Sequence, residues 1–263
     1  MTMTLKGKRA LITGSTSGIG LGIAEALAAA GADIMVNGFE PQSVVEKTAS
    51  DIAKTYKVKT GALSADLTDA KAAEALVAAA EKVLGPLDIL VNNAGIQFVA
   101  PIEEFPLDKW DQIIALNLTA AFRVTRLVFK GMKDRGFGRI VNIDSAHGLV
   151  ASPFKSAYVA AKHGLLGFTK VVALEGAEKN VTCNAICPGY VHTPLVDKQI
   201  DDQAKAHGIS RDRVVSEVIL APQPMKRFTK VEEIGALAAF MCGPGAATMT
   251  GTHVSMDGGW TAR

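Results

Sequence analysis

Short aliphatic or β-branched runs alternate with longer alanine-rich stretches from one end of the chain to the other. We expect strands at Arg9–Thr13, Asp33–Asn37, Lys59–Ser64, Asp88–Asn92, Arg139–Ser145, Val181–Cys187 and His253–Met256. We expect helices at Ile19–Ala30, Ser43–Tyr56, Ala70–Leu84, Leu107–Lys133, Ser156–Ala177 and Val231–Cys242. Strands separated by helices form parallel sheets, and strands that are apolar throughout belong in sheets buried on both faces. The pattern therefore predicts an α/β fold in which helices cover both faces of a seven-stranded parallel sheet.

One region interrupts this alternation. Residues from about 193 to 229 are mostly polar and include Pro222 and Pro224. An insertion this late in an open α/β sheet usually covers the binding site, so we expect a helical lid here. A length of 263 residues suits one large α/β domain, and we expect residues 1–263 to form a single domain.

Charge and cysteine content exclude several classes of protein. A net charge of +2 gives no electrostatic reason to bind nucleic acid or an anionic membrane. Lys6, Lys8 and Arg9 interrupt the apolar run near the N-terminus, so we expect neither a signal peptide nor a spanning helix there. The 3 cysteines form no CxxC motif, and such cysteines are typical of reduced thiols in a cytoplasmic protein. The 5 histidines show no HExxH or paired spacing, so we expect no metal site.

A glycine-rich turn follows the first expected strand and opens the first expected helix. Its sequence is Thr13-Gly14-Ser15-Thr16-Ser17-Gly18-Ile19-Gly20. Gly14 permits a tight turn, Gly18 lets the backbone approach a pyrophosphate, and Gly20 lets the helix pack closely on the sheet. The spacing is GxxxGxG rather than the usual GxGxxG. Its position still predicts that the residues from Gly14 to Ile19 bind a dinucleotide at the helix N-terminus, in a doubly wound fold of the Rossmann type.

Two further strand ends add residues to the same edge of the sheet. The fourth strand ends in Asn92-Asn93-Ala94-Gly95, and ligands of open α/β sheets bind beside the carboxyl ends of the strands. We expect the last three of these residues to line the dinucleotide site, although the asparagines can also serve only to tie neighbouring strands together. Asp66 and Leu67 follow the third strand. The Asp66 carboxylate can accept a hydrogen bond from an adenine amine or act as a turn residue before the next helix.

Tyr158 and Lys162 are four residues apart in an expected helix and therefore lie on one face. A free phenol titrates at about pH 10 and is a poor base at neutral pH. An adjacent ammonium, helped by a positive nicotinamide ring, favours the phenolate and makes it usable for alcohol oxidation or carbonyl reduction. Ser145, at the end of the preceding strand, can hold a substrate oxygen near the phenol. Asn117 is a poor helix former among apolar residues, and is either a tolerated interior residue or a water-holding kink.

Together these motifs resemble the short-chain dehydrogenase/reductase family. The resemblance covers essentially the whole chain and rests on TGSTSGIG, NNAG, Asn117, Ser145, the Tyr158-x-x-x-Lys162 pair and Pro188-Gly189, in that order. It implies that Tyr158 is the general acid/base and that Lys162 binds the nicotinamide ribose while favouring the phenolate. It also implies that Ser145 orients the substrate, that Asn117 holds a relay water, and that the enzyme is a homotetramer.

The resemblance implies a nicotinamide cofactor, with further contacts from Phe39, Pro188, Gly189, Val191 and Thr193. We expect NAD rather than NADP, because a 2′-phosphate needs Arg or Lys after the second strand or within the glycine turn. The second strand ends in Asn37-Gly38-Phe39-Glu40, and neither place has a cation. No acidic ribose ligand stands directly at the strand end, so we expect Phe39 and nearby backbone to shape the site, with Glu40 as a secondary contributor.

Within this family, the chain most resembles the bacterial enzymes that oxidise D-3-hydroxybutyrate. This resemblance rests on the segments NNAGIQ, SAHGLVAS, KSAYVAAKHG and DGGWTAR. It implies that Gln97, His147, Lys155 and Gln199 bind the carboxylate of the substrate, beside Ser145 and Tyr158. The implied reaction is the NAD-dependent, reversible oxidation of D-3-hydroxybutyrate to acetoacetate.

Two positions depart from the pattern of those enzymes. Tyr190 stands where they usually have Trp, which leaves one wall of the pocket open to interpretation. Asp144 replaces a small residue before Ser145. Since side chains alternate along a strand, we expect Asp144 to point to the other face and to have little direct effect on the chemistry.

Two other functions fit part of the sequence. An NAD(P)-dependent reductase of carrier-bound 3-oxoacyl groups would use the same catalytic residues. Its acidic carrier protein would favour a basic patch, for which the near-neutral charge gives no support. A non-catalytic dinucleotide-binding regulator needs only the glycine turn. It does not explain why Ser145, Tyr158 and Lys162 occur together. We therefore expect an enzyme whose partner is a small-molecule substrate.

Overall fold

The computed structural model describes residues 5–193, 196–197, 200–201, 204 and 208–262. Seven strands form one sheet in the order β3-β2-β1-β4-β5-β6-β7, and every neighbouring pair is parallel. The strands are β1 (Arg9–Ile12), β2 (Asp33–Gly38), β3 (Thr60–Ser64), β4 (Ile89–Asn92), β5 (Gly138–Ile143), β6 (Val181–Pro188) and β7 (His253–Met256). The predicted doubly wound sheet is confirmed, and its order reverses between β1 and β4, where such sheets bind ligands.

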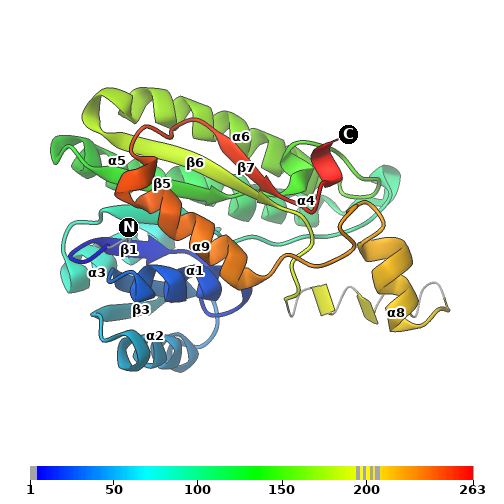
Figure 1. Ribbon diagram of the computed structural model, residues 1–263, viewed down its shortest axis with the longest axis horizontal. Helices are drawn as coiled ribbons and strands as arrows, with labels where there is room; N and C mark the ends of the chain where they lie inside the picture. Colours follow the sequence, from blue (N-terminus) through cyan, green and yellow to red (C-terminus); the bar gives the residue numbers. More distant parts are fainter. Residues whose placement is uncertain (1–4, 194–195, 198–199, 202–203, 205–207, 263) are drawn as a thin grey trace.

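Helices cover both faces of the sheet (Figure 1). The helices are α1 (Gly18–Ala29), α2 (Gln42–Tyr56), α3 (Ala70–Leu84), α4 (Leu107–Ile114), α5 (Ala120–Asp134), α6 (Ser156–Gly176), α8 (Arg211–Arg213) and α9 (Val231–Cys242). Short 3₁₀ turns complete the chain: η1 (Ile102–Glu104), η3 (Ala146–Gly148), η4 (Ala177–Lys179), η6 (Pro244–Ala246) and η7 (Trp260–Ala262). Helix α1 packs on α2 and α9, while α5 packs on α3 and α6.

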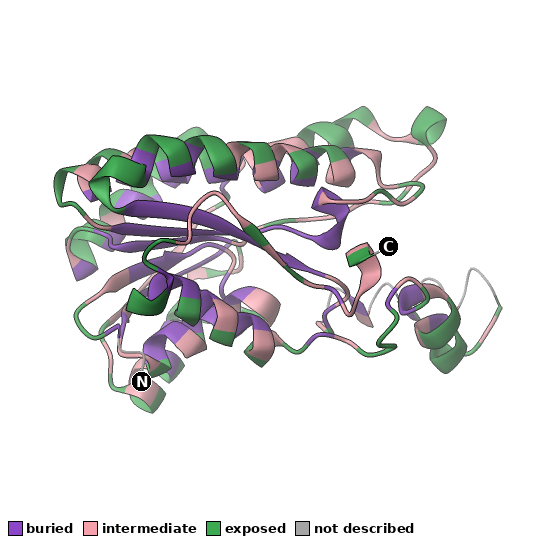
Figure 2. Ribbon diagram, turned by 45° about the horizontal axis from the view of Figure 1, so that its top comes forward, coloured by how far each residue is buried: buried purple, intermediate pink, exposed green. Residues whose placement is uncertain are grey.

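The central strands of the sheet, from β2 to β6, are buried between two apolar clusters (Figure 2). Ile12 of β1 packs in the cluster that includes α1 and α9, whereas its neighbour Leu11 packs in the cluster of α3 and α5. Consecutive residues therefore face opposite helical layers, which explains why the strand sequences are apolar without alternation. Burying one such side chain stabilises the fold by roughly 1.5–3 kcal/mol. The rigid sheet that results holds the ends of its strands in fixed positions.

The helix expected from Leu107 to Lys133 is not α-helical throughout. A π-helix, η2 (Ala115–Thr119), separates α4 from α5. Asn117 lies in it, buried, and its side chain makes two hydrogen bonds to the backbone of Ile96, each of 2.9 Å. The predicted helix is present, as the unbroken helical stretch Leu107–Asp134, with a local π-turn at Asn117. The wider turn lets a polar side chain inside the helical layer reach a backbone partner, and π-turns of this kind often mark functional sites.

Among the described residues, one helical stretch, Leu107–Asp134, is long and apolar enough to cross a membrane by length and composition alone. The share of its most apolar window that is buried inside the protein is 39%. Helices that cover a sheet meet the same criteria, and here α4 packs on α6 while α5 packs on α3 and β5.

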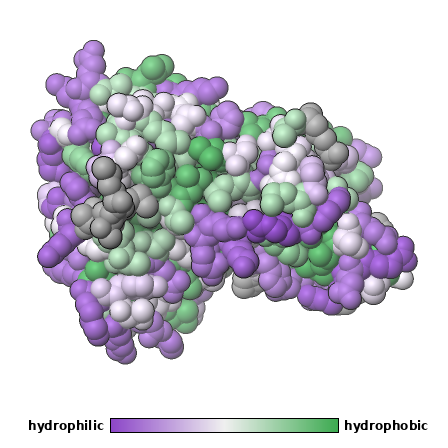
Figure 3. Space-filling view, viewed as in Figure 1, coloured by the Kyte–Doolittle hydropathy of each residue, from purple (hydrophilic) through white to green (hydrophobic). Residues whose placement is uncertain are grey.

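A small lobe follows β6 beside the carboxyl ends of the strands, and it stands out from the main body (Figure 3). It contains α8 and a second π-helix, η5 (Val214–Ile219). Its own apolar cluster includes Val196, Ile200, Val214, Ile219 and Leu220, with Tyr190 and Phe228 packed against it. The lobe coincides with the region where the sequence breaks its alternation, and its position is the one that a lid over the strand ends requires.

Candidate active site

The glycine-rich turn between β1 and α1 adopts the conformation that its glycines allow. Gly14 and Gly18 have φ angles of +61° and +53°, which residues with side chains rarely adopt. A Cβ on Gly20 would overlap the carbonyl oxygen of Gly14, so the turn closes directly onto the helix. The N-terminus of α1, with its unpaired N–H groups and partial positive charge, therefore faces the strand ends as an anion site.

A cavity of about 400 Å³ begins at this turn and follows the carboxyl edge of the sheet. Most of the predicted cofactor residues line it: Gly14, Thr16, Ser17, Gly18, Ile19, Phe39, Asp66, Leu67, Asn93, Ala94, Gly95, Tyr158, Lys162 and Thr193. We call it the cofactor cavity. Gly189 and Val191 line a neighbouring pocket, and Pro188 ends β6 without reaching the lining.

Ser15 faces away from the cofactor cavity. Its hydroxyl is fully buried, donates to the carbonyl oxygen of Ile12 at 2.8 Å, and accepts from the N–H of Asn37 at 3.1 Å. Ser15 therefore joins the glycine-rich turn to β2 by hydrogen bonds. Its side chain holds the turn in position and does not line the cofactor cavity.

Asn93 joins the two turns that form the floor of the cofactor cavity. Its side-chain amide donates to the carbonyl oxygens of Thr13 and Gly14 at 2.9 and 2.8 Å. Thr13 in turn accepts hydrogen bonds from the N–H groups of Asn93 and Ala94 at 2.9 and 3.0 Å. Asn93 thus ties neighbouring strands, as one of the two interpretations held, while it also lines the cavity.

Asp66 combines its two interpretations in the same way. One carboxylate oxygen accepts from the N–H and the hydroxyl of Thr68, at 3.0 and 2.8 Å, as a turn residue does. The side chain is exposed and lines the cofactor cavity. Helix α3 itself is capped by Asp69, whose side chain accepts from the N–H of Lys71.

Glu40 places a carboxylate at the end of the cofactor cavity next to β2. Its Oε1 accepts a hydrogen bond from the hydroxyl of Thr16 at 2.8 Å, while its Oε2 is buried without a partner. A Cβ on Gly38 would overlap this oxygen, so the glycine provides the space for it. Phe39, 80% exposed, lines the same end. Because an unpartnered buried carboxylate oxygen is costly, this end of the cavity suits a ligand with hydroxyl donors, such as a ribose.

Three of the predicted catalytic residues meet where β5 ends and α6 begins. Tyr158 and Lys162 lie on one face of α6, with the Lys162 Nζ 5.6 Å from the centre of the Tyr158 ring. Lys162 is buried and donates a hydrogen bond to the carbonyl oxygen of Ile143 at 2.7 Å. Ser145 lies two residues after the end of β5, and its hydroxyl accepts from the N–H of His147 at 3.1 Å. The rigid end of a buried strand therefore positions the whole group.

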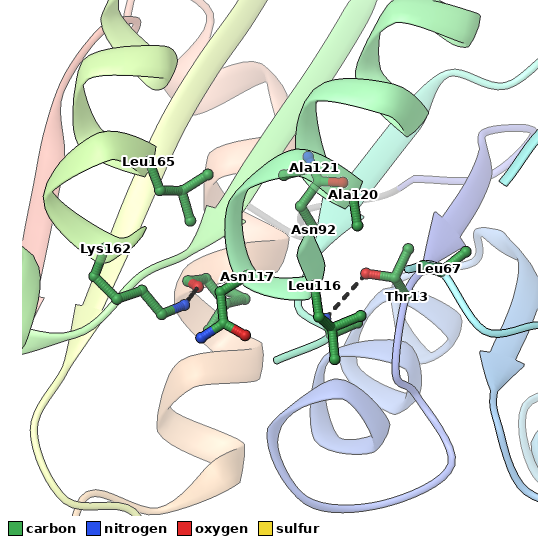
Figure 4. A pocket seen from close by; sticks show the side chains of 11 residues that line it. Thr13, Leu67, Asn92, Leu116, Asn117, Ala120, Ala121, Lys162 and Leu165 are labelled. Atoms are coloured by element: carbon green, nitrogen blue, oxygen red, sulfur yellow. Dashed lines mark hydrogen bonds between the residues drawn. The ribbon is translucent and has the colours of Figure 1, made fainter. Parts of the chain in front are cut away.

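Asn117, the fourth predicted catalytic residue, lies behind this group. A small cavity of about 10 Å³ is lined by Asn117, Lys162, Asn92 and Thr13 among others (Figure 4). That volume is close to the space one water molecule needs, and the lining offers polar partners. The geometry therefore brings Asn117 and Lys162 to one water-sized space.

A second pocket, of about 120 Å³, adjoins the cofactor cavity at Tyr158. Its polar lining includes the predicted substrate residues Gln97, Ser145, His147, Lys155 and Tyr158. We call it the substrate pocket. Gln199, the remaining predicted substrate residue, lies outside the described residues.

The pocket is lined by one partly buried cation, Lys155, and by several neutral donors. Burial lowers the pKa of Lys155 to about 8, and its Nζ donates to the Tyr190 hydroxyl at 3.4 Å. Burial, and then the charge of Lys155, lower the pKa of His147 to about 3, so its imidazole is neutral. The Nε2 of His147 lies 3.0 Å from the Ser152 hydroxyl. The Nε2 of Gln97 is buried without a hydrogen-bond partner.

Aromatic rings form the wall opposite these polar groups. Tyr190 stacks on Trp260 with ring centres 5.7 Å apart, and His147 meets Trp260 edge-on at 5.0 Å. The N–H of Tyr190 donates to the buried Gln223 at 2.5 Å, which fixes this wall. Tyr190 thus closes the pocket at the position where the sequence left its shape open. Trp260 was missed as a pocket residue, although it belongs to the DGGWTAR segment on which the resemblance rests.

Asp144 stands closer to the site than the sequence indicates. It lines the cofactor cavity, whereas Ser145 lines the substrate pocket. Strand alternation does separate the two side chains, as expected. This separation does not by itself imply that Asp144 has little effect on the chemistry. The side chain lines the cofactor cavity, which Tyr158 and Lys162 also line.

Comparison with known proteins agrees with this geometry. The sequence profile described as short chain dehydrogenase matches residues 8–204. D-beta-hydroxybutyrate dehydrogenase of Rhizobium meliloti is 54% identical over 256 residues, which cover 97% of this chain and 99% of that protein. The protein of the same name from Cupriavidus necator is 52% identical over 260 residues, which cover 98% of this chain and 100% of that protein.

A solved structure of L-sorbose reductase from Gluconobacter frateurii, complexed with NADPH and L-sorbose, matches with a TM-score of 0.94 and 31% identity. The match covers 100% of both chains. Fold, sequence profile and full-length relatives agree. The chain therefore belongs to the short-chain dehydrogenase family and is an oxidoreductase that binds a nicotinamide cofactor.

Proposed function

We propose that this protein catalyses the NAD-dependent, reversible oxidation of D-3-hydroxybutyrate to acetoacetate. The substrate pocket carries the proposal: Lys155 places a partly buried cation in it, and Gln97 has a buried donor without a partner. Such groups suit a small molecule with a carboxylate close to its reacting alcohol, because a buried charge or donor is costly without a partner. The names of the two relatives that are 54% and 52% identical support the same substrate.

The pocket also weighs against the two other functions. A 3-oxoacyl group bound to a carrier ends in a thioester, so it would leave Lys155 and Gln97 without an anionic partner. A regulator without catalysis would need the cofactor cavity but would give Ser145 and Tyr158 no reason to face a separate pocket of about 120 Å³. A short hydroxy acid uses both parts of the site.

The residues divide the chemistry among them. A nicotinamide cofactor, which the residues of the cofactor cavity would hold, would supply the acceptor for a hydride from the alcohol carbon. The Ser145 hydroxyl accepts a hydrogen bond from the N–H of His147 and lies 3.4 Å from the Nδ1 of that residue, and in the reaction it donates its proton to the substrate oxygen. Tyr158 takes the alcohol proton during oxidation and returns it during reduction. Lys162, buried beside the ring, stabilises the phenolate, and a water held near Asn117 gives the proton a route outward.

The tetramer implied by the family resemblance is also part of the proposal. Phe122 of α5 and Val171 and Leu174 of α6 expose large apolar side chains. Exposed apolar groups gathered on neighbouring helices are typical of surfaces that meet another subunit. We further propose that this assembly works in the cytoplasm, in keeping with three buried, unpaired cysteines among the described residues.

The cofactor preference rests on Glu40. Its free carboxylate oxygen suits ribose hydroxyls and repels a 2′-phosphate. Glu40→Gln is therefore expected to lower the ratio of kcat/KM with NAD to kcat/KM with NADP by about tenfold or more, as loss of a charge-assisted hydrogen bond implies. Initial rates with each cofactor measure the ratio, with the exposed Glu74→Gln as the control. An unchanged ratio in Glu40→Gln would show that Glu40 has no part in selecting NAD.

The charge of Lys155 predicts how substrate binding depends on pH. With a pKa of about 8, Lys155 is charged below that pH and neutral above it. The KM for D-3-hydroxybutyrate should therefore rise by up to about tenfold for each pH unit above 8, while the Kd for NADH changes little. Steady-state rates at saturating NAD give the first quantity, and fluorescence titration gives the second. A KM that stays level from pH 7 to about pH 9.5 would contradict the assignment of Lys155.

The reaction itself is tested by following NADH absorbance with D-3-hydroxybutyrate, its L enantiomer and, in the reverse direction, acetoacetate and an acetoacetyl thioester. We expect rapid turnover of the D acid and of acetoacetate, and little of the other two. Faster reduction of the thioester than of acetoacetate would favour the 3-oxoacyl reductase instead. Absence of turnover with every substrate would favour the regulator.

A further inference from the structure

We propose that Asp144 is a positioning residue of this active site, whose carboxylate offsets the charge of Lys162 and so sets the pH range in which Tyr158 works. The inference rests on the proposed function, which uses Tyr158 as acid and base. The proposed mechanism assigns Asp144 no step, yet the side chain lines the cofactor cavity together with Tyr158 and Lys162.

The geometry around Asp144 is specific. The residue is 4% exposed, and its Oδ1 accepts a hydrogen bond from the N–H of Ser145 at 2.7 Å. Its Oδ2 is buried without a hydrogen-bond partner. The side chain lines the cofactor cavity together with Tyr158 and Lys162. One oxygen therefore fixes the backbone of Ser145, and the other is left to interact through its charge.

The next turn is shaped to admit this carboxylate. A Cβ on Gly148 in η3 would overlap the Oδ1 of Asp144, so glycine provides its space. The Asp144 carboxylate can therefore occupy this position only because residue 148 has no side chain. Hydrogen bonding to Ser145 alone would also leave the second oxygen unexplained, because burying it without a partner is costly.

The charged and titratable groups around Asp144 come from two elements, α6 and β6. Lys162 and His163 face it from α6, and Cys187 faces it from β6. Asp257, after β7, acts on Cys187 from the far side. Burial raises the pKa of the Cys187 thiol to about 12, so this group stays neutral. Lys162 is thus the buried cation whose charge Asp144 offsets.

Burial also raises the pKa of Asp144 itself to about 7, with Lys162 and the Ser145 N–H opposing the rise. The carboxyl therefore gains its charge in the range where the enzyme has to act. Once ionised, Asp144 offsets part of the positive charge of Lys162. The negative charge of Asp144 thereby makes formation of the Tyr158 phenolate less favourable. Two acids that share one cation titrate in two overlapping steps, so activity should rise with pH more gradually than one proton would dictate.

The variant Asp144→Asn separates charge from shape, because an amide oxygen still accepts from the Ser145 N–H. We expect the pH profile of kcat/KM for oxidation to move by about one unit toward lower pH and to become as steep as a single titration. Glu175→Gln, which replaces an exposed carboxylate of α6 by an amide, is the matched control and should keep the native profile. If Asp144→Asn has the native midpoint and steepness, or if Glu175→Gln causes the same change, the proposal is wrong.

Two measurements on the unreacted protein separate this proposal from the proposed function. Infrared difference spectra of native protein minus Asp144→Asn should show the carbonyl band of a protonated carboxyl that disappears as pH rises through about 7. Because the pKa of Asp144 is raised by folding, its ionisation costs stability: the native protein should lose free energy of unfolding relative to Asp144→Asn between about pH 4 and pH 7.

Should Asp144→Asn fail to fold, Asp144→Ala serves for both measurements. A titrating band in a protein that turns over no hydroxy acid would contradict the proposed function and leave the titration of Asp144 established. A carboxyl band that is absent at about pH 5, or that persists to about pH 9, would overturn the proposal for Asp144 whatever the enzyme's activity.

Discussion

Tyr158→Phe is expected to lower kcat for D-3-hydroxybutyrate oxidation by about 10²–10⁴-fold, the usual contribution of a general acid or base. The phenyl ring preserves the packing of α6 beside Lys162 and His147, but it has no proton to exchange with the substrate oxygen. NADH binding, measured by fluorescence titration, should stay close to native. Loss of turnover with retained cofactor binding would place the defect in the proton transfer.

The control for this variant is Tyr56→Phe, which removes a phenol hydroxyl at the end of α2, away from both cavities. It should keep native activity and cofactor binding. If Tyr158→Phe retained more than about a tenth of native kcat, the role of Tyr158 as general acid/base would be wrong, since even the lower limit of the expected effect is larger.

Lys155→Met is expected to raise the KM for D-3-hydroxybutyrate by about ten- to a hundredfold while the Kd for NADH is unchanged. A hydrogen bond to a charged group contributes roughly 1.5–3 kcal/mol, which corresponds to that range. Methionine keeps the length of the side chain and removes its charge. Lys155 lines the substrate pocket and not the cofactor cavity, so the two binding constants should respond differently.

Lys155 is the N-cap residue of α6, and Lys170 lies on the exposed side of that helix. Lys170→Met is the matched control and should leave both constants at their native values. Equal losses of substrate and cofactor binding in Lys155→Met would indicate damage to the structure of α6 rather than loss of a carboxylate partner. An unchanged KM would remove Lys155 from the substrate site.

Most of the fold could be predicted because its causes are local or periodic. Apolar runs and alanine-rich stretches define the strands and helices, and the glycines between β1 and α1 are required by their backbone angles. Local patterns could not predict the π-turn that surrounds Asn117 within its helix. It depends on a partner, Ile96, that is brought to the helix only when the sheet has formed.

The site shows the same division. Its motifs predicted which residues gather around Tyr158, since the carboxyl ends of parallel strands share one edge. They could not predict that Trp260 stacks on Tyr190, because these residues are far apart in sequence and meet only through the C-terminal turn. Strand alternation placed Asp144 and Ser145 on different sides, but only the folded chain shows a cavity on each side.

The most direct test of this account compares D-3-hydroxybutyrate with its methyl ester on the native enzyme, at saturating NAD and about pH 7.5. The ester keeps the reacting alcohol and loses the negative charge that Lys155 and Gln97 are proposed to bind. We expect kcat/KM for the acid to exceed that for the ester by about a hundredfold or more, since the ester leaves buried polar groups of the pocket unpaired. Equal values of kcat/KM for acid and ester would contradict the account.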